Sequence, residues 1–200
     1  MLNFKSFKNI YGLKDDISIE EMTSYFSKGE VKHFRKKEVL LEAGSRKNVI
    51  FVVVNGLLGK FKLMDSGENK IFDVYPENHV VFNFDMIFTG EPAKFSIEAM
   101  EDTTVLLGDF DYLADLIVSM NTSYPSLHDN LYHLYQKLFF EAHKKIEQFV
   151  FLSPKERYLN FIKENPDLTN RISDKHIAGL LGIHPVTFSR LKKQILYENK

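Results

Sequence analysis

The sequence contains no cysteine and no tryptophan among its 200 residues. Without cysteine the chain forms no disulfide and offers no thiolate to zinc or to an iron–sulfur cluster, so thiol redox sensing is excluded as well. No apolar run approaches the ~18 residues of a membrane-spanning helix, and the first residues lack the pattern of a signal peptide. We therefore expect a cytoplasmic protein that does not associate with membranes.

Phenylalanine is abundant where tryptophan is missing. The chain has 18 Phe and 9 Tyr, hydrophobic residues make up 44% of it, and charged residues make up 26%. These fractions are typical of a globular chain with a sizeable core, so disorder of the whole chain is excluded. A chain of 200 residues allows one large domain or two small ones.

The charges are divided unevenly along the chain, although the formal net charge is only -1. Residues 1–151 hold 17 Lys or Arg against 22 Asp or Glu, a balance of -5, whereas residues 152–200 hold 9 against 5, a balance of +4. A basic end on an acidic body is expected of a protein that binds a polyanion through that end. A chance imbalance of charges on a solvated surface explains the same counts. The charge distribution therefore indicates polyanion binding only together with a sequence motif.

Residues 31–109 have the pattern of an antiparallel β-structure, in which short β-branched and aromatic runs alternate with turn-forming residues. Asn55-Gly56 between two apolar runs predicts a type I′ hairpin, whose two central residues both have positive φ. A capping box at Ser18 predicts a short preceding helix that ends near Gly29. The predicted strands cover residues 49–54, 57–64, 70–75, 79–82, 95–99 and 103–107. Their spacing predicts a roll or sandwich.

A long amphipathic helix is predicted from Pro125 to about Phe151. A helix of ~27 residues is ~40 Å long, which exceeds what a small domain needs for its own core. One face is lined at helical spacing by Leu127, Leu131, Leu134, Leu138, Ala142, Ile146 and Phe149. We expect this face to bind a second copy of the chain, while an aromatic face with Tyr132, Tyr135 and Phe139 lies on the β-structure. A helix that only crosses the β-structure is the alternative.

Residues 152–200 predict a helix-turn-helix. Ser153-Pro154-Lys155-Glu156 is a second capping box, Ser173 caps the next helix, Gly182 supplies the turn, and His184-Pro185 starts the last helix. Hydroxyl and backbone N–H groups at the start of that helix can bond phosphates, and an arginine one turn later can form a bidentate contact with guanine. The candidate DNA-binding residues are Ser173, Pro185, Val186, Thr187, Ser189, Arg190, Lys192 and Lys193. A basic three-helix cap that packs on something else is the alternative.

In the order of its parts the chain resembles the Crp/Fnr family of bacterial transcription regulators, from about Glu21 to Ile195 and most specifically over residues 172–192. The resemblance implies an α+β fold: an antiparallel β-roll (jelly roll) effector domain in residues 1–124, a dimerisation helix in 125–151 and a small helix-turn-helix domain in 152–200. It implies a homodimer that binds double-stranded DNA, with RNA polymerase as a further partner. Arg190 falls on the family's base-contacting arginine, and Thr187 falls on a phosphate-binding position.

This chain departs from the family pattern at two places near its DNA-binding residues. Pro185 and Val186 stand where cyclic-AMP-binding members carry polar residues that read bases, and neither offers a polar group to a base edge. Only four residues follow Leu196, so we expect no β-hairpin wing behind the last helix.

The effector site departs further from the family. Cyclic-nucleotide binders hold the ribose with a Gly-Glu pair and the phosphate with an Arg-Ser or Arg-Thr pair. In the matching segments here Phe84 stands at the position of the Glu and Ala93 at the position of the Arg. Asn83 and Lys94 lie beside them in the candidate pocket, and Lys94 is the one nearby cation. A buried phosphate without a guanidinium is poorly compensated, so we expect that cyclic AMP does not bind in the usual way. No iron–sulfur cluster, other cofactor or metal is predicted, and any effector is an unidentified small molecule.

Two other classes of protein fit the sequence less well. The seven histidines are scattered, and a lone histidine is more often structural than a haem ligand. A cupin-type metalloenzyme needs clustered ligands, yet no His-x-His occurs and no catalytic motif is present, so we do not expect an enzyme. The alternative function is a ligand-sensing β-roll module whose tail binds a protein partner rather than DNA.

Overall fold

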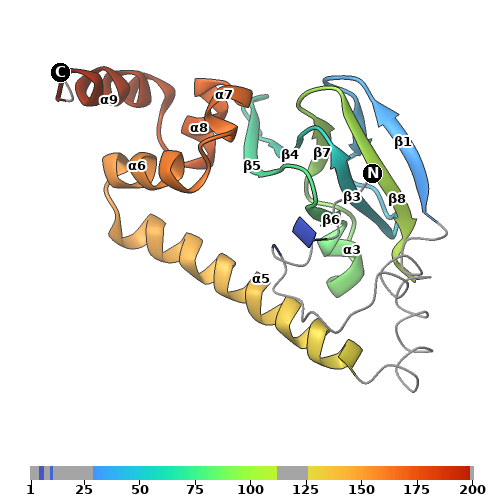
Figure 1. The fold of residues 1–200 in the computed structure, drawn as a ribbon. Helices are drawn as coiled ribbons and strands as arrows, with labels where there is room; N and C mark the ends of the chain where they lie inside the picture. The colour runs from blue at the N-terminus through green and yellow to red at the C-terminus, as the bar shows by residue number, and fades with distance from the viewer. Residues whose placement is uncertain (1–4, 7–9, 11–28, 112–125, 199–200) are drawn as a thin grey trace. The chain divides into compact units, whose positions relative to one another are not determined.

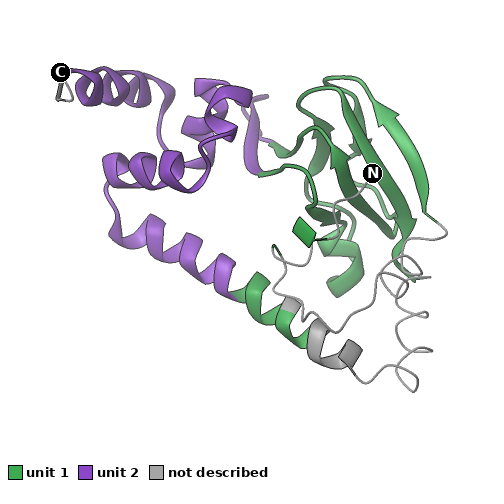
Figure 2. Ribbon diagram, viewed as in Figure 1, with its two compact units in different colours: residues 1–62, 74–139 green, residues 63–73, 140–200 purple. Residues whose placement is uncertain are grey.

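The computed structural model describes residues 5–6, 10, 29–111 and 126–198, so the short helix predicted between Ser18 and Gly29 falls almost entirely outside them. The chain divides into two compact units (Figure 2), one made of residues 1–62 and 74–139 and the other of residues 63–73 and 140–200. The chain passes from one unit to the other at three places, and the last of these falls inside one long helix, which Figure 2 shows in both colours.

The β-structure consists of two four-stranded sheets (Figure 1), with the strand orders β1-β8-β3-β6 and β2-β7-β4-β5. The pairs β1–β8, β3–β8, β3–β6, β2–β7 and β4–β7 are all antiparallel. The strands are β1 (Glu30–Phe34), β2 (Val39–Leu41), β3 (Val49–Asn55), β4 (Leu58–Leu63), β5 (Asn69–Tyr75), β6 (Val80–Phe82), β7 (Ser96–Ala99) and β8 (Thr103–Asp109). The predicted antiparallel jelly roll is thus confirmed, and β1 and β2 are two strands that no predicted run covers.

Both sheets contribute side chains to one apolar core. Successive residues of a strand point to opposite faces, so Phe51 and Val53 of β3 enter the core together while Val52 faces the other way. The buried members are Leu41, Phe51, Val53, Leu58, Val81, Ala93, Ile97, Ala99 and Val105. Phe34, Leu40, Val49, Tyr75 and Leu107 pack against them. The β-branched and aromatic runs of the sequence therefore close the roll by burying one face of each sheet.

The predicted hairpin at Asn55-Gly56 is wrong. Strands β3 and β4 belong to different sheets, so this dipeptide is a corner that carries the chain from one sheet to the other. Gly56 has a φ of 100°, but Asn55 is not among the described residues with positive φ. Gly56 is required because a Cβ there would lie 2.7 Å from the Cα of Thr103. Its N–H donates to Oε1 of Glu77 at 2.9 Å, a contact that the local sequence does not reveal.

The described residues that follow the roll are mostly helical. A short helix, α3 (Phe84–Thr89), follows β6, and the long predicted helix is α5 (Ser126–Phe151). The C-terminal part contains α6 (Pro154–Glu164), α7 (Leu168–Arg171), α8 (Asp174–Leu180) and α9 (Pro185–Glu198). The capping box of α6 is formed, with the Ser153 hydroxyl accepting from the N–H of Glu156 and the Glu156 carboxylate accepting from the N–H of Ser153. The four-residue α7 was not predicted from the sequence.

The aromatic face of α5 does not pack as we expected. Tyr132, Tyr135 and Phe139 have relative exposures of 62%, 54% and 74%, so the expectation that they lie on the roll is wrong for the single chain. The helical period shows which side chains share a face, but both faces of this helix are apolar. The sequence pattern therefore does not tell which of the two faces is covered.

Candidate nucleic-acid interface

The helix-turn-helix is built by local signals in the order in which the sequence presents them. The Ser173 hydroxyl accepts from the N–H of His176 and starts α8. Gly182 follows with a φ of 63°, which costs glycine little, and the N–H of Ile183 donates to the Ala178 carbonyl at 2.8 Å. The chain then enters α9 at Pro185, the first helical position, where a missing N–H is tolerated.

One side of α9 is buried in a small core of its own. Phe188 is only 1% exposed, and its ring meets Tyr158 of α6 edge-on with the centroids 4.9 Å apart. The other buried residues of this core are Leu168, Ile172, Ile177, Ala178, Leu180, Leu181, Ile183 and Ile195. Because this packing covers one face of α9, the opposite face is held in a defined orientation toward solvent.

The predicted DNA-binding residues of α9 lie on that open face, with one exception. The exposed residues are Pro185, Val186, Thr187, Ser189, Arg190 and Lys193, and Ser173 is exposed at the start of α8. They combine hydroxyl groups, the first N–H groups of a helix and two cations, which are the groups that bind phosphate and base edges. The structure thus leaves exposed all of the α9 residues that the sequence pattern selected except Lys192.

Lys192 is the exception, because its ammonium is held within the motif. Its Nζ lies 2.7 Å and 2.8 Å from the two carboxylate oxygens of Asp174 and 5.9 Å from the ring centroid of Phe188. The ion pair joins the first turn of α8 to α9. Asp174 was missed by sequence reasoning, since no local pattern pairs residues in two different helices.

Two of the residues expected to form the effector pocket have structural roles instead. We call residues 83–94 the effector cassette. Asn83 is 2% exposed, accepts the N–H of Met86 at the start of α3, and donates to the carbonyls of Ser45 and Lys47. Ala93 is 5% exposed and belongs to the core of the roll. Neither side chain is free to bind a ligand.

Phe84 lies at the surface of the effector cassette with a relative exposure of 53%. Its ring centroid is 4.6 Å from that of Phe88 and 6.1 Å from that of Phe82. Phe82 also meets Phe110 with the centroids 6.3 Å apart. The position that the resemblance assigns to a ribose-binding glutamate therefore carries one ring of an aromatic cluster.

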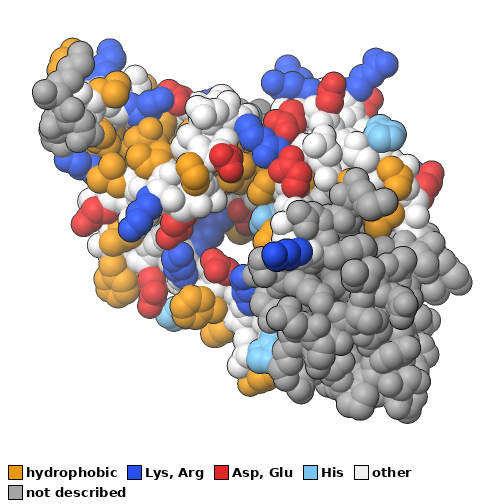
Figure 3. Space-filling model, in the orientation of Figure 1, with side chains coloured by type: hydrophobic (Ala, Val, Ile, Leu, Met, Phe, Trp, Pro, Cys, Tyr) orange, Lys and Arg blue, Asp and Glu red, His pale blue; other side chains and the backbone are white. Residues whose placement is uncertain are grey.

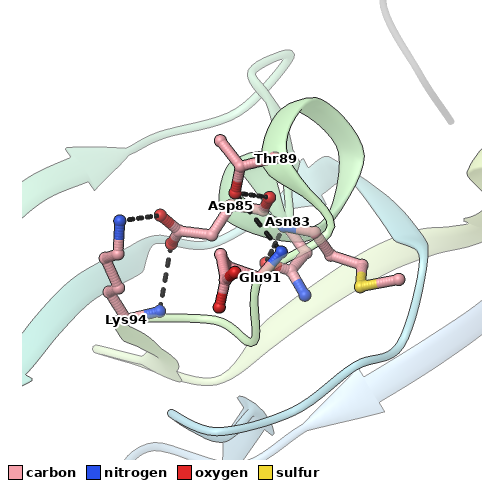
Figure 4. Close-up of polar contacts among 6 residues, drawn as sticks. Asn83, Asp85, Thr89, Glu91 and Lys94 are labelled. Carbon is pink, nitrogen blue, oxygen red and sulfur yellow. Dashed lines mark hydrogen bonds and ion pairs between the residues drawn. The ribbon is translucent and has the colours of Figure 1, made fainter.

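Lys94 of the effector cassette binds a carboxylate of the chain itself. The backbone N–H of Lys94 donates to Oδ2 of Asp85 at 3.0 Å, and its Nζ lies 3.3 Å from Oδ1 of the same residue, as Figure 4 shows. Burial would raise the pKa of Asp85, but the hydrogen bond from the Lys94 backbone and the Lys94 ammonium together hold the pKa below its ordinary value. Asp85 is a residue of the candidate site that sequence reasoning missed.

The expected dimer face of α5 is open wherever the structure describes its side chains. Leu138 and Ile146 have relative exposures of 41% and 61%, and Ala142 is exposed as well. The side chains of Leu127, Leu131 and Leu134 lie outside the described residues. Hydrophobic side chains are visible at the surface along the described part of this helix (Figure 3). None of the described helices combines the length and the apolar character that crossing a membrane requires.

Comparison with known proteins shows what residues 31–119 are similar to. These residues match the family model of the cyclic nucleotide-binding domain. No curated protein sequence matches the chain. Solved structures with the same fold cover most of the chain at low sequence identity.

Three regulators illustrate the shared fold. CLP of Xanthomonas campestris, described as a c-di-GMP responsive global regulator, is 12% identical with a TM-score of 0.70 over 91% of this chain and 93% of that chain. FixK2 of Bradyrhizobium japonicum is 18% identical with a TM-score of 0.68 over 86% of each chain. A mutant of CooA from Carboxydothermus hydrogenoformans is 19% identical with a TM-score of 0.64 over 93% of this chain and 87% of that chain. Residues 31–119 are thus similar to the cyclic nucleotide-binding domain, and the chain as a whole has the fold of the Crp/Fnr regulators.

Proposed function

We propose that this chain is a homodimeric DNA-binding transcription regulator, with an effector domain in residues 1–124, a dimerisation helix in 125–151 and a helix-turn-helix domain in 152–200. The observation that carries the proposal is the two-sided character of α9. Its apolar side is buried through Phe188 and Ile195, while its hydroxyl groups, Arg190 and Lys193 remain exposed.

The exposed side of α9 has the chemistry that a DNA groove requires. An α-helix fits the major groove, and its first turns present side chains to the base edges. Thr187 and Ser189 can bond phosphates, while Arg190 can form two parallel hydrogen bonds with O6 and N7 of one guanine. The balance of +4 in residues 152–200 adds attraction to the phosphate backbone.

The exposed apolar side chains of α5 support dimerisation through this helix. Leu138, Ala142 and Ile146 share one face and are not covered by described parts of the chain. A twofold dimer would place two copies of α9 ~34 Å apart, one turn of DNA, so that each enters a major groove of a near-palindromic site. RNA polymerase is the further partner that we propose for such a regulator.

The effector domain is proposed to respond to something other than cyclic AMP. A cyclic phosphate at the effector cassette would meet the Asp85 carboxylate and would find no guanidinium at position 93, because Ala93 stands at the arginine position. Lys94 is the one cation within residues 83–94, and its ammonium is already paired with the Asp85 carboxylate. An unidentified small molecule, or none, fits the cassette better.

Selection of bound duplexes from a random library tests the proposed function. The full chain should enrich a near-palindromic sequence whose half-sites lie about one helical turn apart. Affinity for that duplex should fall steeply as salt is raised, because phosphate contacts release counterions. A shuffled duplex of the same composition is the control. No enrichment, or retardation that salt does not change, would contradict the proposal and favour a protein partner for the basic tail.

A further inference from the structure

One guanidinium joins the ends of two helices in the second unit. Arg157 of α6 donates from Nη1 to the carbonyl of Leu152 at 2.8 Å and from Nε to the carbonyl of Leu181 at 3.0 Å. Leu152 is the residue directly after α5, and Leu181 is the C-cap of α8. The same side chain therefore contacts the end of the long helix and the turn of the helix-turn-helix.

Both helix ends need such a donor. The last carbonyls of a helix lack partners within the helix and carry the negative end of its dipole, so a nearby cation stabilises them. Neither α5 nor α8 has a basic residue in its last turn. Arg157 supplies the cation from a third helix, and its planar group can serve two acceptors in fixed directions.

Phe149, in the last turn of α5, also contacts the Arg157 guanidinium that binds the carbonyls of Leu152 and Leu181. Its ring centroid lies 5.3 Å from Cζ of Arg157, within the range of a cation–π contact. The same ring lies against the turn of the helix-turn-helix, because a Cβ on Gly182 would come 2.7 Å from Cε1 of Phe149. Gly182 is thus required by close approach as well as by its positive φ.

We infer that Arg157 is a positioning residue that fixes the direction of α9 relative to α5, and thereby the half-site spacing that a dimer reads. The inference rests on the proposed function, since half-sites exist only for a dimer on DNA. Without the two hydrogen bonds, α5 and the helix-turn-helix remain connected by Leu152 and Ser153 but can rotate about that link. The recognition helices of two protomers then reach differently spaced half-sites with similar ease.

The first test measures affinity as a function of half-site spacing. The duplex selected by the wild-type chain is varied by inserting or removing single base pairs between its half-sites. The wild-type chain should prefer its best spacing over the next by about tenfold, which is the scale of one mismatched base pair. Arg157→Gln and Arg157→Lys should both flatten this preference to within about threefold, because a lysine offers one point charge and cannot hold both carbonyls.

A single half-site duplex reports whether the variants still fold. Arg157→Gln and Arg157→Lys should bind it with the wild-type affinity, because the α9 surface itself is unchanged. Lys163→Gln, which removes an exposed cation from the last turn of the same helix, is the matched control and should keep the wild-type spacing profile. A spacing profile that Arg157→Gln leaves unchanged would overturn the inference while the proposed function stands.

A second measurement needs no DNA. The chain has no cysteine, so Glu141→Cys in α5 and Leu196→Cys in α9 place two spin labels without competing sites. Labelled chains are diluted into unlabelled protein so that only the distance between the two labels of one chain is measured. The distribution of this distance should be narrow when Arg157 is present and clearly broader with Arg157→Gln. Distance distributions of equal width in the two backgrounds would overturn the inference that Arg157 holds α9 in a fixed direction relative to α5. A wild-type chain that selects no DNA would overturn the proposed function, together with the half-site part of the inference.

Discussion

The Asp85 carboxylate accepts the backbone N–H of Lys94 at 3.0 Å and lies 3.3 Å from the ammonium of the same residue. In the effector cassette, an anion of the chain itself thus engages Lys94, the cation beside the position at which the family resemblance expects the phosphate-binding arginine. The aromatic rings of Phe84 and Phe88 lie on the outside of the same short helix. The cassette is therefore stabilised by internal contacts.

Cyclic AMP should not bind to this chain at concentrations that saturate ordinary cyclic-nucleotide receptors. The phosphate would find no guanidinium at Ala93 and would be repelled by Asp85. Isothermal titration calorimetry with cyclic AMP, and with AMP as a control, should give no saturable heat up to about 1 mM, which corresponds to less than about 4 kcal/mol of binding free energy. Micromolar one-to-one binding would show that other residues replace the missing arginine.

The Asp85–Lys94 contact should make stability depend on pH in the acid range. The pKa of Asp85 in the folded chain is below its ordinary value, so its carboxylate stabilises the fold above the unfolded pKa of about 3.9. This stabilisation is lost as the pH falls through the pKa that Asp85 has in the folded chain. Asp85→Asn should lower the free energy of unfolding by about 1 kcal/mol at pH 7.

Urea unfolding of wild-type and Asp85→Asn protein at pH 7, 5 and 3 measures this difference, which should shrink toward acid pH. Glu91→Gln removes an exposed carboxylate from the same cassette and should change little at any pH. A deficit of Asp85→Asn that stays constant from pH 7 to pH 3 would show that altered packing, and not the charge, causes it.

Arg190→Ala and Lys193→Ala should have different effects on DNA binding. If Arg190 contacts a base, its removal should cost ~1–3 kcal/mol and relax the preference at one base pair in each half-site. Lys193 is exposed on the same helix, and its removal should weaken all sequences about equally and reduce the salt slope by about 1. Fluorescence anisotropy on a panel of single-base variants of the selected duplex separates the two patterns. If Arg190→Ala keeps the sequence preference of the wild-type chain, a residue other than Arg190 contacts the bases.

Asp174→Asn should increase DNA affinity. The ion pair with Asp174 now holds the Lys192 ammonium, and its removal frees that cation for a phosphate. We expect an affinity gain of a few-fold and a salt slope that is steeper by about 0.9, as for one added phosphate contact. Lys192→Gln should show neither gain. Because exposed ion pairs contribute about 0–1 kcal/mol, thermal unfolding of Asp174→Asn should change little, and a large drop would mean that the pair mainly holds α8 on α9.

Charged substitutions on one face of α5 should separate the proposed dimer. Leu138→Asp combined with Ala142→Asp places two carboxylates on the leucine face, where burying them against a partner is costly. Light scattering on the eluting protein should then give the mass of one chain. Tyr132→Asp combined with Phe139→Asp puts the same charges on the aromatic face and should leave the dimer intact. The reverse result would move the interface to the aromatic face.

Signals that act over a few residues predicted local structure well. The capping box at Ser153, the N-cap at Ser173 and the turn at Gly182 are confirmed, because each depends on residues within about one helical turn of the backbone groups concerned. Asn55-Gly56 failed for the opposite reason. Its conformation depends on Thr103 and Glu77, which are far along the chain, and the same dipeptide can join strands of one sheet or of two.

The order of β-roll, long helix and helix-turn-helix, the antiparallel character of the strands and the polar pattern of α9 were predicted from residue types and their period, because backbone propensity and amphipathicity are properties of neighbouring residues. Only the folded chain brought Asp85 to Lys94, Asp174 to Lys192, and Arg157 to the carbonyls of Leu152 and Leu181. Those contacts join residues from different elements, and their geometry follows from packing that no local pattern encodes.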